Sequence, residues 1–414
     1  MMPQPNPAPR ESWASTAVKD VRSVVVVGGG PAAHRCVTEL RRIGFDGSVT
    51  MVSAEPLPPY DRTLLSKDNL TDATAEIAVM APEGTYESLG VEVLLGREAT
   101  DVDAGARAIR LADGGVLHYD RLVLATGGAP ILPRPFAAPG VLTMRTSADV
   151  APVRDALERS RHIVVIGAGF IGGEIAAAAV RAGCGVTLIE ACQVPLEPIL
   201  GSQVGRLVGD LHVSQGVDLR CGVRAEGVLE AGGGYRVDLS DGSRLQCDSV
   251  IVGVGMRPSV GWLRPTGIEI GRAILTDAAC RTSLPGVLAA GDCAQWWSGR
   301  YGEYCHVEHW DTAGKHGAAA ARTVLGQDTV FDPVPFFWSD QYDVKYQWAG
   351  YAPTWDTVEI DGTGPTAFTA SYLNQGRPVA VFVANQPKEF GRLRRALLAG
   401  PEKSTRDDKE INAS

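Results

Sequence analysis

Two short apolar runs, each ending in a glycine-rich turn, dominate the hydrophobic pattern of the first half of the chain. Residues 24–27 are four valines followed by GGGPAA, and residues 163–166 read IVVI followed by GAGFIG. A run of four or five apolar residues predicts a buried strand, and the apolar spacing after each turn predicts a helix. We therefore expect each copy to form a strand, a tight turn and a helix.

Both turns have the spacing of loops that bind a dinucleotide pyrophosphate. The first reads G-x-G-x-x-A and the second reads G-x-G-x-x-G. The six positions are Gly28, Gly30, Ala33, Gly167, Gly169 and Gly172. Glycines let the backbone approach a pyrophosphate, and the free N–H groups and dipole at the helix start favour its negative charge. Either motif alone is weak evidence, but the two together indicate two nucleotide sites.

An acid follows the second apolar strand of each copy. Glu55 ends the run at 49–55, and Glu190 ends the run at 186–190. A carboxylate at this point of a βαβ unit hydrogen-bonds ribose hydroxyls. Because it would also repel the 2′-phosphate of NADPH, Glu190 favours NADH. No arginine follows Glu190 nearby in the sequence to reverse this preference.

The parallel between the two copies continues beyond the turns. LADG at 111–114 matches LSDG at 239–242, and residues 120–127 match residues 248–255 at the same offset. The chain therefore carries an internal duplication, in which D-G turns join short strands that return to each main sheet. Two folds predict two dinucleotides, FAD and a nicotinamide nucleotide. The alternative, in which one copy is a degenerate scaffold, is disfavoured by the intact turns.

Composition fits a soluble multidomain enzyme. The 414 residues predict two or three domains, and the net charge of −9 argues against general binding to nucleic acid or anionic membranes. No apolar segment approaches the roughly 18 residues of a spanning helix, and the first 19 residues lack the apolar core of a secretory signal. The eight cysteines occur singly, without a CxxC pair, so we predict reduced, mostly buried thiols and no metal site. A cytoplasmic protein is expected.

The stretch PPYDRTLLSK at 58–67 resembles the P-Y-[DE]-R-P-P-L-S-K block of the FAD-dependent ferredoxin and rubredoxin reductases that serve oxygenases and cytochromes P450. The likeness extends over about residues 21 to 395. Further similar blocks follow in the family's order: ATG at 125–127, GMRP at 255–258, AGDCA at 290–294, EHW at 308–310 and FWSDQYD at 337–343. Thr63 and Leu64 depart from the family's two prolines.

The resemblance implies an α/β architecture of the glutathione-reductase type. Two Rossmann-like domains and a small C-terminal α+β domain are expected, as a monomer or a homodimer. The expected parts are an FAD domain at 21–145 and 262–330, an inserted NAD domain at 146–261, a reductase domain at 331–400, and flexible tails at 1–20 and 401–414.

Site residues follow from the same resemblance. The positions expected to contact FAD are Gly28, Gly30, Ala33, Glu55, Arg62, Lys67, Ala125, Thr126, Gly127, Gly291 and Asp292, and those expected at the nicotinamide nucleotide are Gly167, Gly169, Gly172, Glu190 and Gly255. Lys67 is expected near the flavin ring and Asp292 at the ribityl chain. Trp310 and Trp338 match aromatic positions around the isoalloxazine.

Glu174 lies on the same helical stripe as Ile171, Ile175 and Ala178. An unpaired carboxylate is costly in that position unless the site uses it. The resemblance puts this acid beside the nicotinamide, so Lys67, Glu174 and Trp310 are the predicted catalytic residues. The alternative for Glu174 is a structural ion pair.

The predicted reaction carries electrons from NADH through FAD to a [2Fe-2S] ferredoxin. No cysteine lies between Cys36 and Cys184, where related disulfide reductases, persulfide reductases and oxidases carry theirs. A basic patch at Lys388, Arg392, Arg394 and Arg395 could steer an acidic ferredoxin, although a solvated helix face is equally compatible. Two rivals stay open: direct reduction of a small molecule or oxygen, including a nitrite-reductase-like module, and an apoptosis-inducing-factor-like sensor of NADH.

Overall fold

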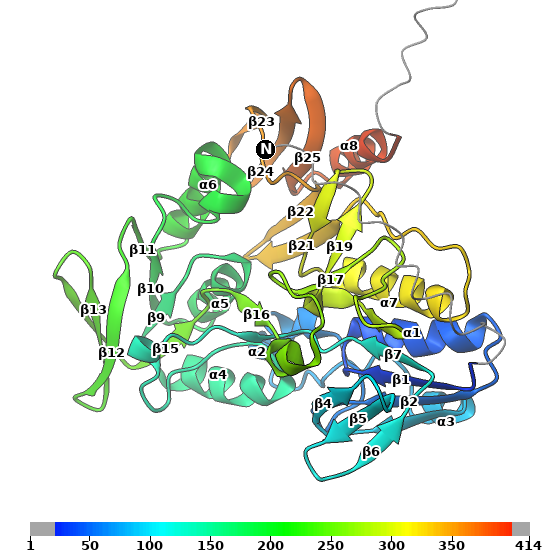
Figure 1. The fold of residues 1–414 in the computed structure, drawn as a ribbon. Helices are drawn as coiled ribbons and strands as arrows, with labels where there is room; N and C mark the ends of the chain where they lie inside the picture. Colours follow the sequence, from blue (N-terminus) through cyan, green and yellow to red (C-terminus); the bar gives the residue numbers. More distant parts are fainter. Residues whose placement is uncertain (1–20, 400–414) are drawn as a thin grey trace, which may run out of the picture.

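The computed structural model of the protein describes residues 21–399; the predicted tails at 1–20 and 401–414 lie outside them. Its first unit is a parallel sheet (Figure 1). In spatial order the strands are β18 (Val287–Ala289), β7 (Arg121–Leu124), β1 (Ser23–Val27), β2 (Ser48–Val52) and β3 (Val91–Leu94). The strand order shows that the first unit is discontinuous, because β18 comes from far down the chain.

The alternating side chains of β1 explain how this sheet is covered on both faces. Val24 and Val26 pack in a core with the helices α1 (Pro31–Arg42) and α7 (Trp310–Val324). Val25 and Val27 pack on the other face against the sheet formed by β4 (Ala99–Asp103), β5 (Ala108–Leu111) and β6 (Val116–His118). A Cβ at Gly317 of α7 would lie 2.0 Å from the carbonyl oxygen of Ala32, so only glycine allows the two helices to pack this closely.

The second unit repeats this arrangement. Its parallel strands are, in spatial order, β11 (Asp218–Cys221), β10 (Gly185–Glu190), β9 (His162–Ile166) and β15 (Ser249–Val252). One face packs on α4 (Ser147–Arg159) and α5 (Phe170–Arg181), and the other packs on the antiparallel sheet of β12 (Ala225–Ala231), β13 (Gly234–Leu239) and β14 (Arg244–Cys247). The predicted α/β fold with two Rossmann-like units is therefore confirmed.

A two-stranded ribbon connects the two units. β8 (Gly128–Pro130) leads out of the first unit and pairs antiparallel with β16 (Met256–Pro258), which leads back. A Cβ at Gly128 would lie 2.7 Å from the carbonyl oxygen of Arg257, so the close approach of the strands requires glycine. The return path continues through β17 (Ile274–Thr276), β19 (Ala294–Ser298) and β20 (Glu303–Cys305), which form a small sheet beside the first unit.

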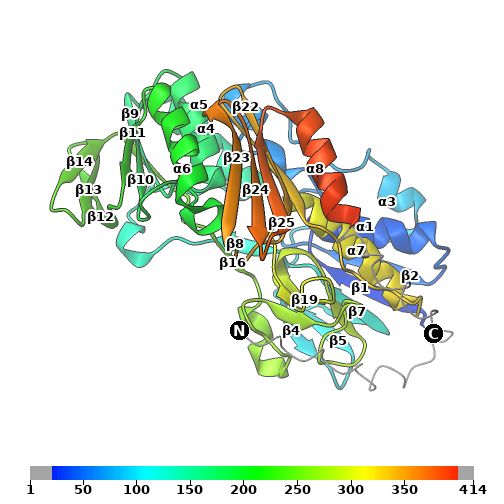
Figure 2. The ribbon, with the colours of Figure 1, turned by 90° about the horizontal axis from the view of Figure 1, so that it is seen from above.

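The C-terminal unit is an antiparallel sheet between two helices (Figure 2). Its strands are, in spatial order, β21 (Phe336–Gln341), β22 (Val344–Gly350), β25 (Arg377–Ala384), β24 (Ala367–Asn374) and β23 (Thr357–Gly364). One face shares a core with α6 (Glu197–Ser214) of the second unit, and the other packs on α8 (Pro387–Ala399). The shared core ties this sheet to the second unit. Within residues 21–399, no helix combines the length and the apolar character needed to cross a bilayer.

Candidate active site

A continuous cleft of about 1290 Å³ runs between the two parallel units and the C-terminal sheet. It is lined by both glycine turns, by the loop that holds Arg62 and Lys67, and by Phe337 and Trp338 of β21. All the site residues predicted from the sequence line this cleft, except Ala33 and Gly172. The fold therefore brings residues from four distant stretches of the chain to one cavity.

The geometry of the glycine turns fits two pyrophosphates. Gly28 and Gly167 have φ of +139° and +102°, and a Cβ there would lie 2.0 and 2.5 Å from the carbonyl oxygens of Ala125 and Gly253. Gly30 and Gly169, the N-caps of α1 and α5, have open space on the Cβ side: nothing lies within 4 Å of Gly30, and only one atom, 3.9 Å away, lies near Gly169. Each helix thus presents its free N–H groups to the cleft, where a phosphate would replace the missing side chain.

Ala33 and Gly172 lie beneath the turns rather than in the cleft. Ala33 is fully buried in the core of the first unit. A Cβ at Gly172 would lie 1.9 Å from the carbonyl oxygen of Gly167. The third position of each motif therefore serves the close packing of helix on strand, which is a separate requirement from phosphate contact.

Glu55 has two partners that connect it to the neighbouring loop. Its carboxylate forms an ion pair with Arg62 and accepts a hydrogen bond of 2.5 Å from the hydroxyl of Tyr60. The Arg62 guanidinium lies over the Tyr60 ring, 4.7 Å from its centroid, and burial raises the pKa of the Tyr60 hydroxyl. Because Tyr60 also accepts a hydrogen bond from the backbone N–H of Ser147, this network links both units at the cleft wall.

Glu190 is held at the second glycine turn by backbone N–H groups. One carboxylate oxygen accepts from Ala168 and the other accepts from Cys192, each at 2.9 Å. The side chain is therefore fixed at the end of β10 before any ligand arrives. A carboxylate oriented in this way can accept further hydrogen bonds from ribose hydroxyls, since each oxygen has a second lone pair.

Glu174 lies where the three units meet, and it is 3% exposed. Its Oε1 is 2.8 Å from Lys67 Nζ and accepts a hydrogen bond of 2.6 Å from Ser339 of β21, while Oε2 accepts one from Ser66. Lys67 also donates to the carbonyl oxygen of Thr63 at 3.0 Å. The buried charge is thus both paired and hydrogen-bonded, as a stable buried carboxylate requires.

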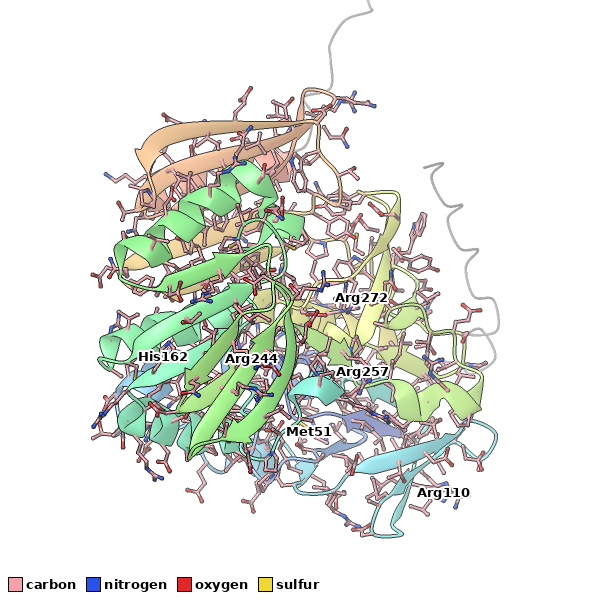
Figure 3. The ribbon with its side chains drawn as sticks, turned by 90° about the vertical axis from the view of Figure 1, so that its left-hand side faces the viewer. Met51, Arg110, His162, Arg244, Arg257 and Arg272 are labelled. Carbon is pink, nitrogen blue, oxygen red and sulfur yellow. The ribbon has the colours of Figure 1, made fainter. Side chains whose placement is uncertain are left out.

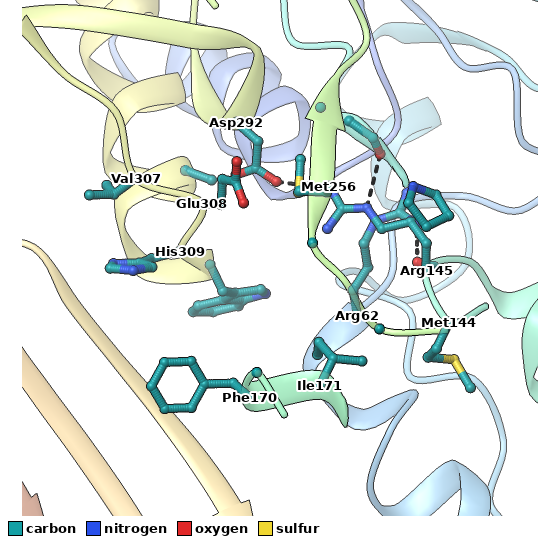
Figure 4. Close-up of a pocket in the computed structure, with 18 of the residues that line it drawn as sticks. Arg62, Met144, Arg145, Phe170, Ile171, Met256, Asp292, Val307, Glu308 and His309 are labelled. Atoms are coloured by element: carbon teal, nitrogen blue, oxygen red, sulfur yellow. Dashed lines mark hydrogen bonds and ion pairs between the residues drawn. The ribbon is translucent and has the colours of Figure 1, made fainter. Parts of the chain in front are cut away.

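A second ion pair closes the opposite wall (Figure 4). Arg145 donates to Asp292 at 2.9 Å and to the carbonyl oxygen of Gly128 at 3.0 Å. Glu308 lies beside Asp292, and burial together with the Asp292 charge raises the pKa of its carboxyl, against the opposing effect of His306. The wall therefore carries two acids close together, each paired with an arginine: Asp292 with Arg145 at 2.9 Å and Glu308 with Arg272 at 3.3 Å.

Aromatic side chains from α5, α7 and β21 surround the middle of the cleft. The Phe170 and Phe337 rings meet edge to face with centroids 4.7 Å apart, and the Trp310 and Trp338 rings do so at 6.2 Å. Trp310 is 36% exposed, whereas burial lowers the pKa of the neighbouring His309 to about 4. An apolar slot lined by aromatic rings, with one exposed indole, suits a planar ring system that must stay reachable from outside.

Several of these site residues had not been identified from the sequence. Arg145, Ser66 and Ser339 hold predicted site residues. Ser66 and Ser339 lie inside the blocks at 58–67 and 337–343, whereas no motif surrounds Arg145. Glu308 and Tyr60 also belong to blocks that carry the family resemblance, so the blocks themselves were the available signal. Arg145 can be identified only from the structure, in which the residues that lead into α4 lie beside Asp292.

The comparisons with known proteins agree with this geometry. Residues 22–317 match the model of the family described as pyridine nucleotide-disulphide oxidoreductase, and residues 336–410 match the reductase C-terminal family. The chain belongs to the pyridine nucleotide-disulphide oxidoreductase family. This family membership implies binding of FAD and NAD(P), and it confirms the family predicted from the motifs.

Individual relatives cover nearly the whole chain. It is 35% identical to the ferredoxin–NAD(+) reductase component of the anthranilate 1,2-dioxygenase system of Burkholderia cepacia, over 91% of this chain and 94% of the relative. The crystal structure of Fdr9 is 39% identical with a TM-score of 0.84, and covers 92% of this chain and 95% of its own. The covalent putidaredoxin reductase–putidaredoxin complex matches at 30% identity and a TM-score of 0.88, over 92% and 93%.

Proposed function

We propose that this protein is an NADH:ferredoxin reductase that passes electrons through FAD to a [2Fe-2S] ferredoxin of an oxygenase or cytochrome P450 system. The observation that carries the proposal is the cleft itself, because two glycine turns and one aromatic slot open into the same cavity. The relatives named above as ferredoxin reductases support the choice of acceptor.

We assign FAD to the part of the cleft built by residues 21–145 and 262–330, and NADH to the part built by 146–261. Gly28, Gly30, Glu55, Arg62 and Asp292 would hold FAD, and Gly167, Gly169 and Glu190 would hold NADH. When bound, FAD supplies the step from two-electron to one-electron chemistry. The protein's own contribution is binding, alignment and electrostatics.

The Lys67–Glu174 pair is the proposed centre of that alignment. Its two hydroxyl partners, Ser66 and Ser339, come from the first unit and the C-terminal unit. Because Glu174 itself lies on α5 of the second unit, the pair fixes the three units at one point. A residue set locked by packing and hydrogen bonds holds two reacting rings in register better than loops alone.

We propose that the ferredoxin that accepts the electrons docks at Trp310 and the adjoining C-terminal unit. On α8, Arg392 is paired with Glu389 at 2.8 Å and Arg394 lies 4.6 Å above the Phe336 ring, whereas Lys388 and Arg395 are exposed. A basic patch of this kind can steer an acidic carrier in spite of the acidic total charge.

Anaerobic double-mixing stopped flow tests the proposal. The flavin absorbance should bleach on mixing with NADH, and a [2Fe-2S] ferredoxin added in the second mix should then reduce cytochrome c. Bleaching without onward transfer, with a persistent long-wavelength band, would instead support an NADH sensor. Bleaching that only small oxidants or oxygen reverse would support direct reduction of a small molecule.

A further inference from the structure

The second half of the cleft contains one unused positive charge. Among the residues of 146–261 that line the cleft, Arg224 is the only basic one, against the acids Glu174 and Glu190. Glu174 is committed to Lys67. A nicotinamide nucleotide carries a pyrophosphate, and NADPH carries a further phosphate. The single basic side chain in this half of the cleft is therefore a candidate to bind a phosphate of the nucleotide.

The backbone fixes Arg224 next to Glu190. The N–H of Val223 donates to the carbonyl oxygen of Glu190 at 3.2 Å, and the N–H of Gly222 donates to that of Cys192 at 2.7 Å. The N–H of Arg224 is itself held by the hydroxyl of Ser240 at 3.0 Å. The backbone of Arg224 therefore lies directly beside the end of β10, where the carboxylate of Glu190 faces the expected position of the ribose.

The side chain is also available. Arg224 is exposed, and within residues 21–399 its guanidinium has no ion pair or hydrogen bond, unlike three arginines of the same region. Arg220 is paired with Asp218, and both Arg236 and Arg244 are paired with Asp238. An arginine without a partner at a cleft mouth keeps its full capacity for a bidentate phosphate contact.

We propose that Arg224 is a specificity-determining residue that binds the 2′-phosphate of NADPH, so that the site accepts NADPH as well as NADH. The inference rests on the proposed nucleotide site. Glu190 disfavours the 2′-phosphate, and Arg224, reaching the same place from the neighbouring strand, offsets that repulsion. Reading forward from Glu190 in the sequence finds no arginine because the compensating charge comes from beyond the next strand.

Equilibrium binding to the oxidised holoprotein tests this without turnover. Isothermal titration calorimetry would compare NAD⁺ with NADP⁺, and 5′-AMP with 2′,5′-ADP, which differ only in the 2′-phosphate. The variants are Arg224→Ala, Arg224→Lys and the matched control Arg244→Ala. Arg244 is an exposed arginine on the adjoining small sheet, labelled in Figure 3, and it does not line the cleft.

Arg224→Ala should weaken NADP⁺ and 2′,5′-ADP by about fivefold or more while changing NAD⁺ and 5′-AMP by less than about twofold. Arg224→Lys should keep most of the affinity, and Arg244→Ala should change neither pair. Equal losses for both pairs, no loss in Arg224→Ala, or binding of NAD⁺ without NADP⁺ to the wild type would overturn the inference alone. Absence of binding of either nucleotide to the wild type would overturn the nucleotide site as well.

Discussion

The Oε1 atom of Glu174 lies 2.8 Å from Nζ of Lys67, and this buried pair joins α5 of the second unit to the loop of the first. Glu174→Gln keeps the size and most hydrogen bonds but leaves the Lys67 charge unpaired. We expect the free energy of unfolding to fall by about 3 kcal/mol, because removing one partner of a buried pair strands the other. Urea unfolding measures this, and the rate of flavin bleaching by NADH should fall by about tenfold or more.

The double variant Glu174→Gln/Lys67→Met separates the ion pair from general damage. Removing both charges should be less destabilising than the sum of the single changes, since neither charge is then left alone. Additive losses would show that the two side chains act independently, in disagreement with the geometry.

Gly169→Asp should block the nicotinamide nucleotide without disturbing FAD. The Cβ position of Gly169 faces open space, so the variant should fold, and its carboxylate would meet the pyrophosphate. We expect the bleaching of the flavin by NADH to slow by about 100-fold or more while the FAD content stays full. The reason is that the new carboxylate and the pyrophosphate carry like charges, and placing them side by side costs several kcal/mol. Gly30→Asp is the matched change in the first unit and should instead lose FAD; loss of FAD from Gly169→Asp would contradict the assignment of the two turns.

Arg145→Gln should weaken FAD retention by about tenfold, because it removes a charge-assisted hydrogen bond that orients Asp292. Ultrafiltration followed by absorbance of the released flavin measures the dissociation constant. Arg145→Lys should retain part of the affinity. Arg257→Gln, on the exposed side of β16, provides a control that should bind FAD normally, and equal losses in both variants would count against a specific role for Arg145.

Acid should destabilise the protein through His316. Its imidazole is buried, stacks on Phe331 with centroids 4.1 Å apart, and accepts the Gly291 N–H at 3.2 Å. Burial lowers its pKa to about 3, below the unfolded value of about 6.5. The unfolded chain therefore binds more protons between these values, and His316 alone lowers stability by about 1.4 kcal/mol per pH unit as pH drops below about 6.5. Burial also lowers the pKa of His34, His212 and His309 to about 4, so these residues add to the same slope.

His316→Gln should reduce the slope of stability against pH between pH 7 and pH 5, by the share that this one imidazole contributes, measured as the free energy of unfolding in urea at each pH. The slopes of unfolding free energy against pH are compared between the variant and the wild type, because the substitution will also lower the stability itself at every pH. His118→Asn, at an exposed position, should keep the wild-type slope. An unchanged slope in His316→Gln would mean that this imidazole does not stay neutral in the folded state.

Local chemistry explains why the two nucleotide folds were predictable. Four valines before a glycine turn, repeated with an acid at the next strand end, leave few alternatives for the backbone. The partners of Glu174 were not predictable in the same way, because Ser66 and Ser339 meet it only after three units have packed. Arg224 illustrates the same limit, since proximity across parallel strands has no short-range pattern in the sequence.

The first two units are joined by β8 and β16, which run side by side with Gly128 opposite Pro258. The chain therefore leaves the first unit and returns to it at one point on the surface of that unit. A module attached in this way does not interrupt the sheet that carries it, since its two ends meet at β8 and β16. The duplicated half of this enzyme is thus an insertion at a two-stranded stem, and a homologous module grafted onto that stem would also have to reproduce the contacts of α5 and α6 with the other two units.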